Sequence, residues 1–195
     1  MKWGTILKGA TNMLAKMETF YDLDLASNVK LTIENAQDTM SKKSDYVREA
    51  FAPTNTSIAV SHELRKSSQY FVVSDAAKEH GFGVHQHNKL FLIYLPYSAI
   101  AYSMASTYTS DAGMTNVATE VENPLYFVFL SSVLGTSNIV EIPEESFKII
   151  CSTKYDVKVG YRLTYDSKDF VISDIERFTE GCNSMLLTSE TRVTS

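Results

Sequence analysis

The chain has 195 residues, of which 44% are hydrophobic and 21% are charged, proportions typical of soluble globular proteins and not of disordered chains. A chain of this length forms one domain by default and buries a core large enough to be stable without disulfides or metals. The net charge of −5 argues against a dedicated sequence-reading nucleic-acid-binding protein, because such proteins usually present a basic face. We therefore expect a single domain over residues 1–195.

The N-terminus carries the clearest helical pattern in the chain. Lys2, Lys8 and Lys16 point away from an apolar stripe at helical spacing. The stripe consists of Trp3, Ile6, Leu7, Ala10, Met13, Leu14 and Met17. We expect an amphipathic helix or arm over residues 1–21, which packs on its own domain or docks on a neighbouring subunit.

Most of the chain that follows is predicted to form strands. The segment from Asn28 to Ile33 alternates polar and apolar residues, as a half-buried strand does, whereas Ser44 to Ala50 is predicted to be a short helix before Pro53. Six further segments are dense in β-branched and aromatic residues, which favours strands. They are residues 57–60, 69–73, 89–95, 125–130, 139–142 and 147–151.

Residues 97–123 show little regular pattern and are rich in hydroxyl groups. A segment of this length without periodicity is unusual inside a compact domain and is often functional or mobile. Because it also contains Tyr102, Met104, Tyr108 and Met114, it is not a pure solvent linker. We expect a long polar loop, or a long hairpin, that projects from a sheet.

The C-terminal region is predicted to be a three-stranded meander. Residues 161–165 and 169–177 form two strands around a tight turn, and residues 184–188 form the third. The alternation falters at Ile175, which indicates a bulge or a twist. With the earlier strands, the meander predicts a mainly β fold, a β-barrel or a sandwich, plus the N-terminal helix. No internal repeat is expected.

Several classes of protein are disfavoured by what the sequence lacks. The N-terminus has no signal-peptide pattern, and the longest apolar runs have six residues, far fewer than the roughly 20 that span a bilayer. Cys151 and Cys182 are therefore expected to be reduced thiols of a soluble protein made in a cytoplasm. No nucleophile elbow, phosphate-binding loop, dinucleotide fingerprint or pair of closely spaced cysteines is present. We expect no enzyme activity, no catalytic residues and no cofactor.

One cluster of histidines is a candidate metal site. His80, His85 and His87 lie within eight residues, and on a regular strand His85 and His87 share a face, with Glu79 or His80 as a further ligand. The alternative is a polar turn with solvated histidines, which we favour because no third ligand stands at a diagnostic spacing. We expect no bound metal. The acidic pairs Asp22/Asp24 and Glu144/Glu145 are interpreted as ordinary surface pairs.

The negative charge is concentrated in one segment. Residues 90–147 contain no lysine, arginine or histidine but six of the 23 acids, which leaves 18 basic against 17 acidic residues elsewhere. A conduit for DNA should not bind phosphates tightly, since each basic contact adds affinity and slows passage. This segment therefore suits the lining of such a conduit, with Asp111, Glu120 and Glu122 as candidate lining residues. The simpler interpretation is buried strands plus a polar loop.

Residues 142–172 and the strand after them resemble the C-terminal pattern of head–tail joining (connector or neck) proteins of tailed bacteriophages. In that family a strand follows a glycine–aspartate–x–hydrophobic step, a short turn leads to a lysine–aromatic–x–isoleucine pattern, and a last strand follows. Here the step is Gly160 to Leu163, with Tyr161 where an aspartate is common, and the turn has Ser167 where a glycine is usual. Lys168 to Ile172 fits the pattern with one extra residue. Ser184 to Leu187 fits the last strand, and the connector-like region spans residues 142–190.

The resemblance implies a structural virion protein, an adaptor or a stopper, which assembles in the host cytoplasm. Such proteins form a homo-oligomeric ring between portal and tail proteins, and genomic DNA passes through the ring without sequence-specific binding and without a membrane. The family has no catalytic residues. The alternative function is a stand-alone β-rich domain or hydrolase that holds a ligand or metal near His85, His87 and the segment from Tyr94 to Tyr97.

Overall fold

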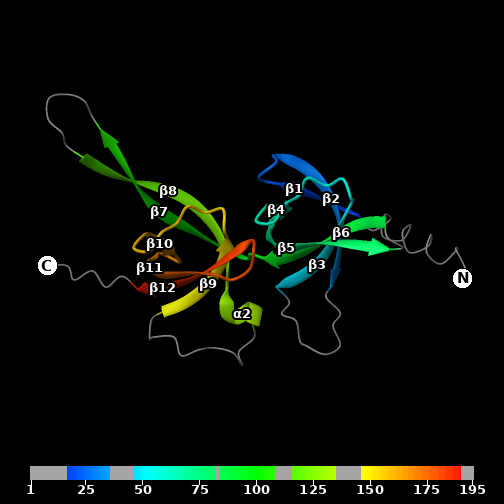
Figure 1. Ribbon diagram of the computed structural model, residues 1–195. Coiled ribbons are helices and arrows are strands. Elements are labelled where there is room, and N and C mark those ends of the chain that lie inside the picture. Colours follow the sequence, from blue (N-terminus) through cyan, green and yellow to red (C-terminus); the bar gives the residue numbers. More distant parts are fainter. Residues whose placement is uncertain (1–16, 36–45, 82–83, 109–115, 135–145, 190–195) are drawn as a thin grey trace, which may run out of the picture.

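A computed structural model describes residues 17–35, 46–81, 84–108, 116–134 and 146–189 of the protein, and shows two closed antiparallel barrels side by side (Figure 1). The N-terminal barrel consists of β1 (Glu18–Asp22), β2 (Ser27–Asn35), β3 (Val47–Ala52), β4 (Glu63–Lys66), β5 (Gln69–Gly81) and β6 (Val84–Tyr94). The C-terminal barrel consists of β7 (Tyr97–Tyr108), β8 (Asn116–Phe129), β9 (Ser146–Ser152), β10 (Arg162–Tyr165), β11 (Lys168–Arg177) and β12 (Cys182–Ser189). The five-residue helix α2 (Leu130–Leu134) follows β8.

The prediction of a mainly β fold is confirmed, but the strands close into two barrels and not into one barrel or sandwich. The C-terminal meander is confirmed as the neighbouring strands β10, β11 and β12, and the expected bulge lies between Ile172 and Asp174. Residues 97–108 and 116–123 belong to the long hairpin of β7 and β8, one of the two forms expected, and residues 109–115 lie outside the described part. The interpretation of residues 1–195 as one domain stays a prediction.

Three local predictions are wrong. The helix expected from Ser44 to Ala50 overlaps strand β3, where pairing with β2 on one side and β6 on the other overrides local propensity. Residues 57–60 are a loop, because the chain must turn at Ser61, whose φ is +74°. Residues 18–21 are strand and not helix. The other residues of the predicted helical stripe, apart from Met17, and the strand predicted over residues 139–142 lie outside the described part.

The two barrels are structural repeats of each other, contrary to the expectation of no repeat. The strand order β1-β2-β3-β6-β5-β4 of the first barrel recurs as β7-β8-β9-β12-β11-β10 in the second. Each position of β4 and β5 corresponds to a position 99 residues later in β10 and β11, and Leu64 and Leu163, which correspond, are both fully buried. The hairpins Lys66–Gln69 and Tyr165–Lys168 close with the same register.

The repeat extends to details that packing alone does not require. Ser61 and Gly160, which precede β4 and β10, both have positive φ, +74° and +90°. The N–H of Ser61 donates to the carbonyl of Val73 and the N–H of Gly160 to that of Ile172, both at 2.8 Å. Each barrel also has its β-bulge directly after that carbonyl residue. Equivalent residues can therefore be assigned between the barrels, strand by strand.

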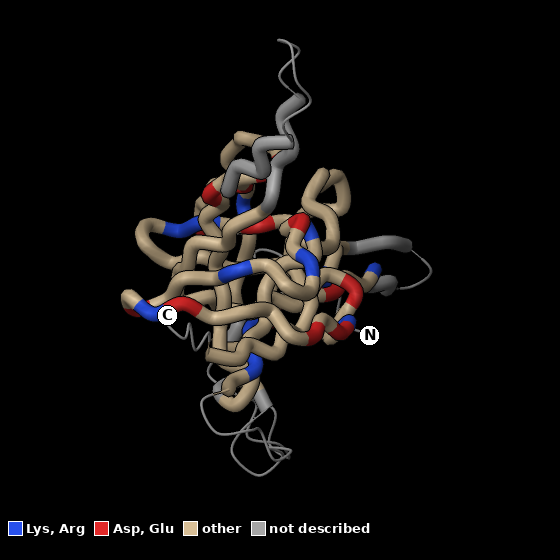
Figure 2. Tube along the Cα trace, turned by 90° about the vertical axis from the view of Figure 1, so that its left-hand side faces the viewer, with Lys and Arg blue, Asp and Glu red and all other residues tan. Residues whose placement is uncertain are grey.

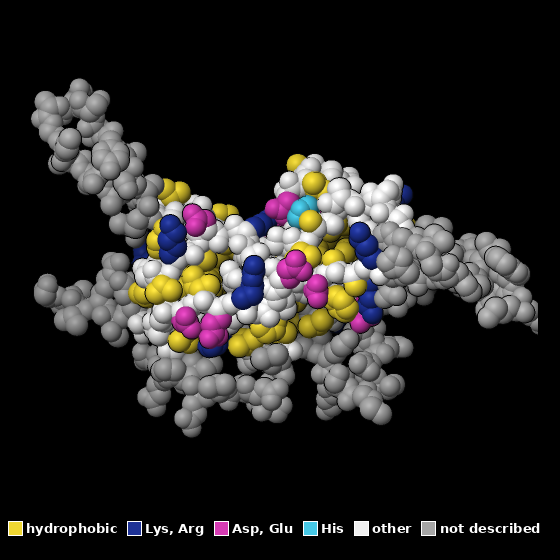
Figure 3. Space-filling model, in the orientation of Figure 1, with side chains coloured by type: hydrophobic (Ala, Val, Ile, Leu, Met, Phe, Trp, Pro, Cys, Tyr) yellow, Lys and Arg dark blue, Asp and Glu magenta, His cyan; other side chains and the backbone are white. Residues whose placement is uncertain are grey.

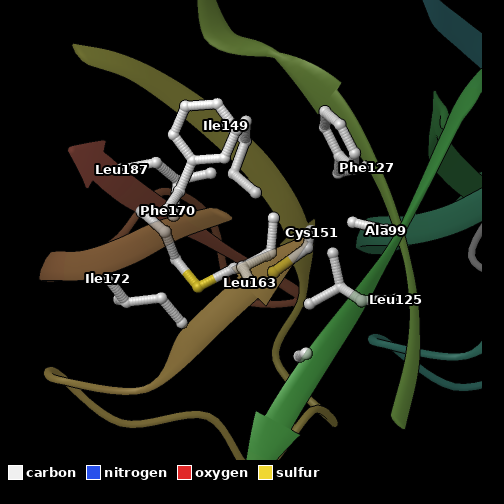
Figure 4. Packing of buried hydrophobic residues seen from close by; sticks show 11 residues of the cluster. Ala99, Leu125, Phe127, Ile149, Cys151, Leu163, Phe170, Ile172 and Leu187 are labelled. Atoms are coloured by element: carbon white, nitrogen blue, oxygen red, sulfur yellow. The ribbon is translucent and has the colours of Figure 1, made fainter. Parts of the chain in front are cut away.

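Each barrel has its own apolar interior. In the C-terminal barrel, Phe127, Ile149 and Leu163 are fully buried and point toward one another (Figure 4). Aromatic rings close one end of this core, with Phe147 edge-on to Phe170 at 4.8 Å between ring centroids. The interior of the N-terminal barrel is built from smaller groups around a T-shaped aromatic pair. Its fully or nearly fully buried residues are Phe20, Leu31, Ala50, Ala52, Leu64, Phe71, Val73, Leu90 and Leu92.

A third apolar cluster joins the barrels; we call this interface the seam. Val72 and Ile93 from the N-terminal barrel pack with Val128 and Ile150 from the C-terminal barrel. Other members are Leu95, Cys182, Tyr46, Tyr70, Tyr126, Leu130, Val133 and Phe178. A main-chain hydrogen bond crosses the seam where the β11–β12 turn meets the N-terminal barrel, since the Gly181 N–H donates to the Ser74 carbonyl at 2.9 Å.

Substitution of Gly181 tests the seam. A Cβ at this position would lie 2.1 Å from the Val73 carbonyl oxygen and 2.8 Å from the Ser61 nitrogen, so Gly181→Ala forces the barrels apart. We expect it to lower the free energy of unfolding in urea by about 2–4 kcal/mol. The control is Gly160→Ala, where a Cβ meets nothing within 4 Å and only its φ of +90° costs about 1 kcal/mol. Equal losses for the two variants would contradict this account of the seam.

Candidate functional site

A group of charged side chains from both barrels lies at the edge of the seam. It consists of Asp22, Asp24, His62 and Glu63 from the N-terminal barrel and Lys154 from the C-terminal barrel. Figure 3 shows a histidine, acidic groups and a basic group gathered near where the barrels meet. We call this group the seam cluster.

Hairpin geometry positions the acidic half of the seam cluster. Asp22 ends β1, is fully buried, and its Oδ1 accepts the N–H groups of Asp24 and Leu25 at 2.9 and 3.0 Å. This arrangement is an Asx turn, which the short side chain of aspartate favours. Its Oδ2 lies 2.9 Å from Nδ1 of His62. The interpretation of Asp22 as a surface acid is therefore wrong, because the side chain closes the β1–β2 turn from inside.

Lys154 connects the acidic half to the other barrel. Its Nζ lies 3.0 Å from Oε2 of Glu63 and 3.2 Å from Oδ1 of Asp24. The carboxyl group of Glu63 is only 3% exposed, and its Oε1 accepts no hydrogen bond within the described part. A buried carboxylate is costly unless a cation compensates it, so Lys154 stabilises both Glu63 and the contact between the barrels.

Tyr155 lies beside the same glutamate. Burial, and the nearby negative charge of Glu63, hold the pKa of the Tyr155 hydroxyl far above its usual value. The hydroxyl accepts the N–H of Tyr126 at 3.2 Å, so it serves as a fixed hydrogen-bonding group and not as a base. Tyr155 and Lys154 also line a pocket of about 260 Å³ with Ser103, Asn123 and Tyr161.

A stacked tyrosine pair closes another part of the seam. The rings of Tyr70 and Tyr126 lie 3.7 Å apart, at an interplanar angle of 14°. A hydrogen bond between the hydroxyls lowers the pKa of Tyr70 and raises that of Tyr126 to about 12. Tyr126 is the donor of that bond, since the donor holds its proton more tightly.

The arrangement of the seam cluster is that of a structural junction. One ligand atom each from Asp22, Asp24 and His62 lies within 4.8 Å of the others, a spacing that could hold a cation. However, both oxygens of Asp22 and both oxygens of Asp24 already bind N–H groups, His62 or Lys154. The ammonium group of Lys154 therefore already supplies positive charge at this site.

The two thiols cannot act as nucleophiles in the folded protein. Cys151 and Cys182 are free and fully buried. Burial raises the pKa of the Cys182 thiol to about 12 and that of Cys151 also well above its usual value. Only a thiolate is an effective nucleophile, so both groups are inert at neutral pH.

The structure does not assemble a histidine site from the part of the cluster that it describes. The ring of His87 packs edge-on against Phe51 at 4.9 Å. Backbone pairing places His87 opposite Glu79 and His80 opposite His85, with an irregularity between these pairs, so the regular alternation assumed for His85 and His87 is interrupted. The side chains of Glu79, His80 and His85 lie outside the described part. The expectation of no metal stays a prediction.

The other sequence candidates occupy structural positions. The segment from Tyr94 to Tyr97 connects the barrels, with Leu95 1% exposed in the seam and Tyr97 packed on the C-terminal core. Many described residues between positions 90 and 147 lie in strands and are buried. Lysine and arginine are rarely buried, and this explains part of their absence from the segment. Glu122 is exposed on β8, the side chain of Glu120 lies outside the described part, and so does Asp111.

The sequence reasoning missed the residues of the seam cluster. The Asx turn at Asp22 has a local signal, an aspartate at the end of an alternating strand. His62, Glu63 and Lys154 carry no such signal. The pairing of β1 with β4 brings His62 and Glu63 to Asp22 and Asp24, and only the packing of the two barrels brings Lys154 to them. The correspondence of β4 and β5 with segments 99 residues later is the sequence feature that could have predicted two barrels.

Comparison with known proteins supplies no family. No protein-family model matches the chain, and no curated protein and no solved structure is significantly similar to it. Within the described part, no helix is long and apolar enough to cross a membrane.

Removal of the Lys154 charge tests the seam cluster. Lys154→Met leaves Glu63 buried without its cation, and we expect a loss of about 2 kcal/mol in the free energy of unfolding. Adding Glu63→Gln to that variant should recover part of this loss. The control is Lys66→Met, because the pair of Lys66 and Glu18 is exposed and contributes about 0.5 kcal/mol or less. A loss in Lys154→Met no larger than in this control would contradict the role of Lys154.

Alkaline pH tests the raised pKa values of Cys182 and Tyr126. The pKa of Cys182 and that of Tyr126 are raised to about 12 in the folded chain, from the ordinary values of 9.0 and 10.0. Raised values mean that the folded chain holds protons that the unfolded chain releases, so stability is complete below pH 9 and falls as the pH rises toward 12. We expect the urea midpoint to decrease above about pH 9. Cys182→Ala should make the decrease between pH 9 and 10 shallower, and an unchanged slope would contradict this assignment.

Proposed function

We propose that this chain is a structural protein of a tailed-phage virion, which forms an oligomeric ring in the head–tail connector, joins portal and tail proteins, and surrounds the DNA channel. The observation that carries the proposal is the duplication of the connector-like hairpin. The segment that resembles the family folds as β10 and β11, after the positive-φ Gly160. Its counterpart, β4 and β5 after Ser61, builds the other barrel.

The form of the molecule supports an assembly role. Beyond the barrel, residues 103–108 of β7 pair only with β8 among the described strands, so the two strands form a free ribbon (Figure 1). An isolated two-stranded ribbon is marginally stable in water and gains stability from a partner surface. The ribbon is part of the segment without basic residues, so it can approach DNA without binding its phosphates.

The chemistry of the described part supports a structural role over catalysis. The charged groups of the seam cluster bind one another, and the thiols are buried and protonated. No observation among the described residues favours the alternative site near His85 and His87. In this proposal the protein acts through its surfaces, which contact further copies of the chain, portal and tail proteins, and passing DNA.

The proposal is tested in phage particles. Glu122 pairs with Tyr102 at the base of the ribbon, where β7 also pairs with β10. If this base lines the channel, Glu122→Lys adds a cation that binds phosphates, and we expect slower DNA delivery and about tenfold fewer infectious particles at unchanged assembly. The control is Glu180→Lys, the same charge change at an exposed turn of the C-terminal barrel. Absence of the protein from purified virions by mass spectrometry would contradict the proposal. Normal DNA delivery by the Glu122→Lys variant would show that the base of the ribbon does not line the channel.

A further inference from the structure

One end of the N-terminal barrel holds a pocket, and we call this end the mouth. It is the end at which β1, β3 and β5 begin and β2, β4 and β6 finish. Side chains alternate between the two faces of a strand, so Arg48 lies on the same inward side as the fully buried Ala50, and Lys66 on that of Leu64. The side chains that line the pocket are those of Glu18, Ile33, Arg48, Lys66, Gln69, Phe71 and Tyr94.

The repeat identifies the same layer of side chains at the equivalent end of the C-terminal barrel. The 99-residue offset relates β4 and β5 to β10 and β11, and strand pairing extends the correspondence around the barrel, because counterparts pair with counterparts. The corresponding pairs are Glu18 and Tyr97, Ile33 and Phe129, Arg48 and Phe147, Lys66 and Tyr165, Gln69 and Lys168, Phe71 and Phe170, and Tyr94 and Ser189.

Aromatic rings fill this layer in the C-terminal barrel. The ring of Phe147 lies 4.8 Å from that of Phe170 and 5.4 Å from that of Phe129, measured between centroids. Tyr97 packs on Phe129 at 4.9 Å and on Tyr165 at 6.1 Å. The equivalent end of this barrel is therefore closed by the rings of its own chain.

The N-terminal barrel lacks four of these rings and has a pocket of about 300 Å³ at the mouth. Glu18, Ile33, Arg48 and Lys66 stand where the other barrel has aromatic residues. A volume of this size falls at the lower end of the range for small-molecule sites, which often lie at the ends of β-barrels. The space that one barrel fills with its own rings is thus available to a ligand in the other.

The pocket has an apolar floor with two aromatic rings. Phe71 is 5% exposed, and its ring lies 5.3 Å from that of Tyr94, tilted by 39°. Ile33 supplies a half-buried aliphatic surface beside them. Aromatic rings prefer tilted or edge-on neighbours at such distances, so a planar ring suits this floor.

The charges at the mouth leave one cation in excess. Lys66 and Glu18 form an ion pair and neutralise each other. Arg48 forms no ion pair within the described part of the chain, and its Nη1 donates one hydrogen bond, to the Val47 carbonyl at 3.3 Å. A guanidinium group binds a carboxylate through two parallel hydrogen bonds, so Arg48 suits a ligand with one negative charge.

We propose that the mouth binds a small aromatic carboxylate, with its ring on Phe71 and Tyr94 and its carboxylate on the guanidinium group of Arg48. A pocket of about 300 Å³ has the liquid volume of about ten water molecules, which suits a ligand of about ten non-hydrogen atoms. This inference goes beyond the proposed function, since binding at the mouth needs neither a ring of subunits nor a virion.

Titration calorimetry of the purified full-length chain with phenylacetate tests the proposal. We expect a dissociation constant of about 1 mM or lower, as for a small ligand that is well enclosed. Acetate lacks the ring, and phenethylamine carries the same ring on a cation, so each should bind at least about tenfold more weakly. Absence of binding by phenylacetate, or equally tight binding by phenethylamine, overturns the proposal.

Substitutions of Arg48 test the anion contact. Arg48→Met should weaken phenylacetate binding about tenfold or more, and Arg48→Lys should weaken it less, because lysine keeps the charge and loses the paired hydrogen bonds. The control is Arg177→Met, which removes an exposed arginine at the end of β11 and should leave the affinity unchanged. Figure 2 views the molecule from the side of the C-terminal barrel and shows basic and acidic positions interspersed among the described residues there. Equal losses in Arg48→Met and Arg177→Met would contradict the assignment of Arg48.

A variant that copies the other barrel separates binding from folding. Arg48→Phe introduces the counterpart residue of Phe147, whose ring should fill the mouth and abolish binding without lowering the urea midpoint. In the wild-type chain, nuclear Overhauser effects should join the ring protons of phenylacetate to the methyl groups of Ile33. Wild-type affinity in Arg48→Phe, or Overhauser contacts only with residues outside the mouth, overturns the site.

The outcomes also separate the mouth from the proposed function. A chain that binds phenylacetate at the mouth but is absent from virions supports this inference and overturns the proposed function. A virion protein that does not bind phenylacetate overturns this inference alone.

Discussion

The molecule depends on the seam, because two closed barrels have no strand edges in their bodies through which to pair. The strands of each barrel pair only with strands of the same barrel. What joins them is side-chain packing around Val72, Ile93 and Ile150, and close backbone contact at Gly181. Such packing is not directional, so the relative position of the barrels depends on a few specific groups.

The seam cluster supplies that specificity. An apolar seam alone tolerates sliding, since hydrophobic burial depends on area and not on direction. Lys154 reaches Glu63 and Asp24 only in one relative position of the barrels, because both contacts lie near 3 Å. Buried ion pairs stabilise weakly compared with apolar replacements, but breaking one is costly, which penalises alternative arrangements. The pair of Glu63 and Lys154 therefore fixes the register of two bodies that apolar packing holds together.

The sequence predicted the strands of the C-terminal barrel best, since their alternation and turns are local. The bulge near Ile175 and the hairpin at Asp166 were visible for the same reason. Strand β3 and the loop at residues 57–60 were missed, because in β3 the neighbouring strands decide the structure and in the loop Ile58 fills the core without strand pairing. The contacts of the seam cluster join residues from 39 to 130 positions apart, and no local pattern encodes such contacts.

The ribbon of β7 and β8 has a mechanical consequence. Near Ile100 and Tyr102 it is anchored by pairing with β10, and Arg162 of β10 stacks on the Tyr102 ring at 3.9 Å. Beyond this anchor, no described strand supports it. It therefore acts as a cantilever, in which a load at the tip produces its largest bending moment at Tyr102. Because β7 is paired with β10 at this point and Arg162 stacks on Tyr102, bending of the ribbon acts first on β10.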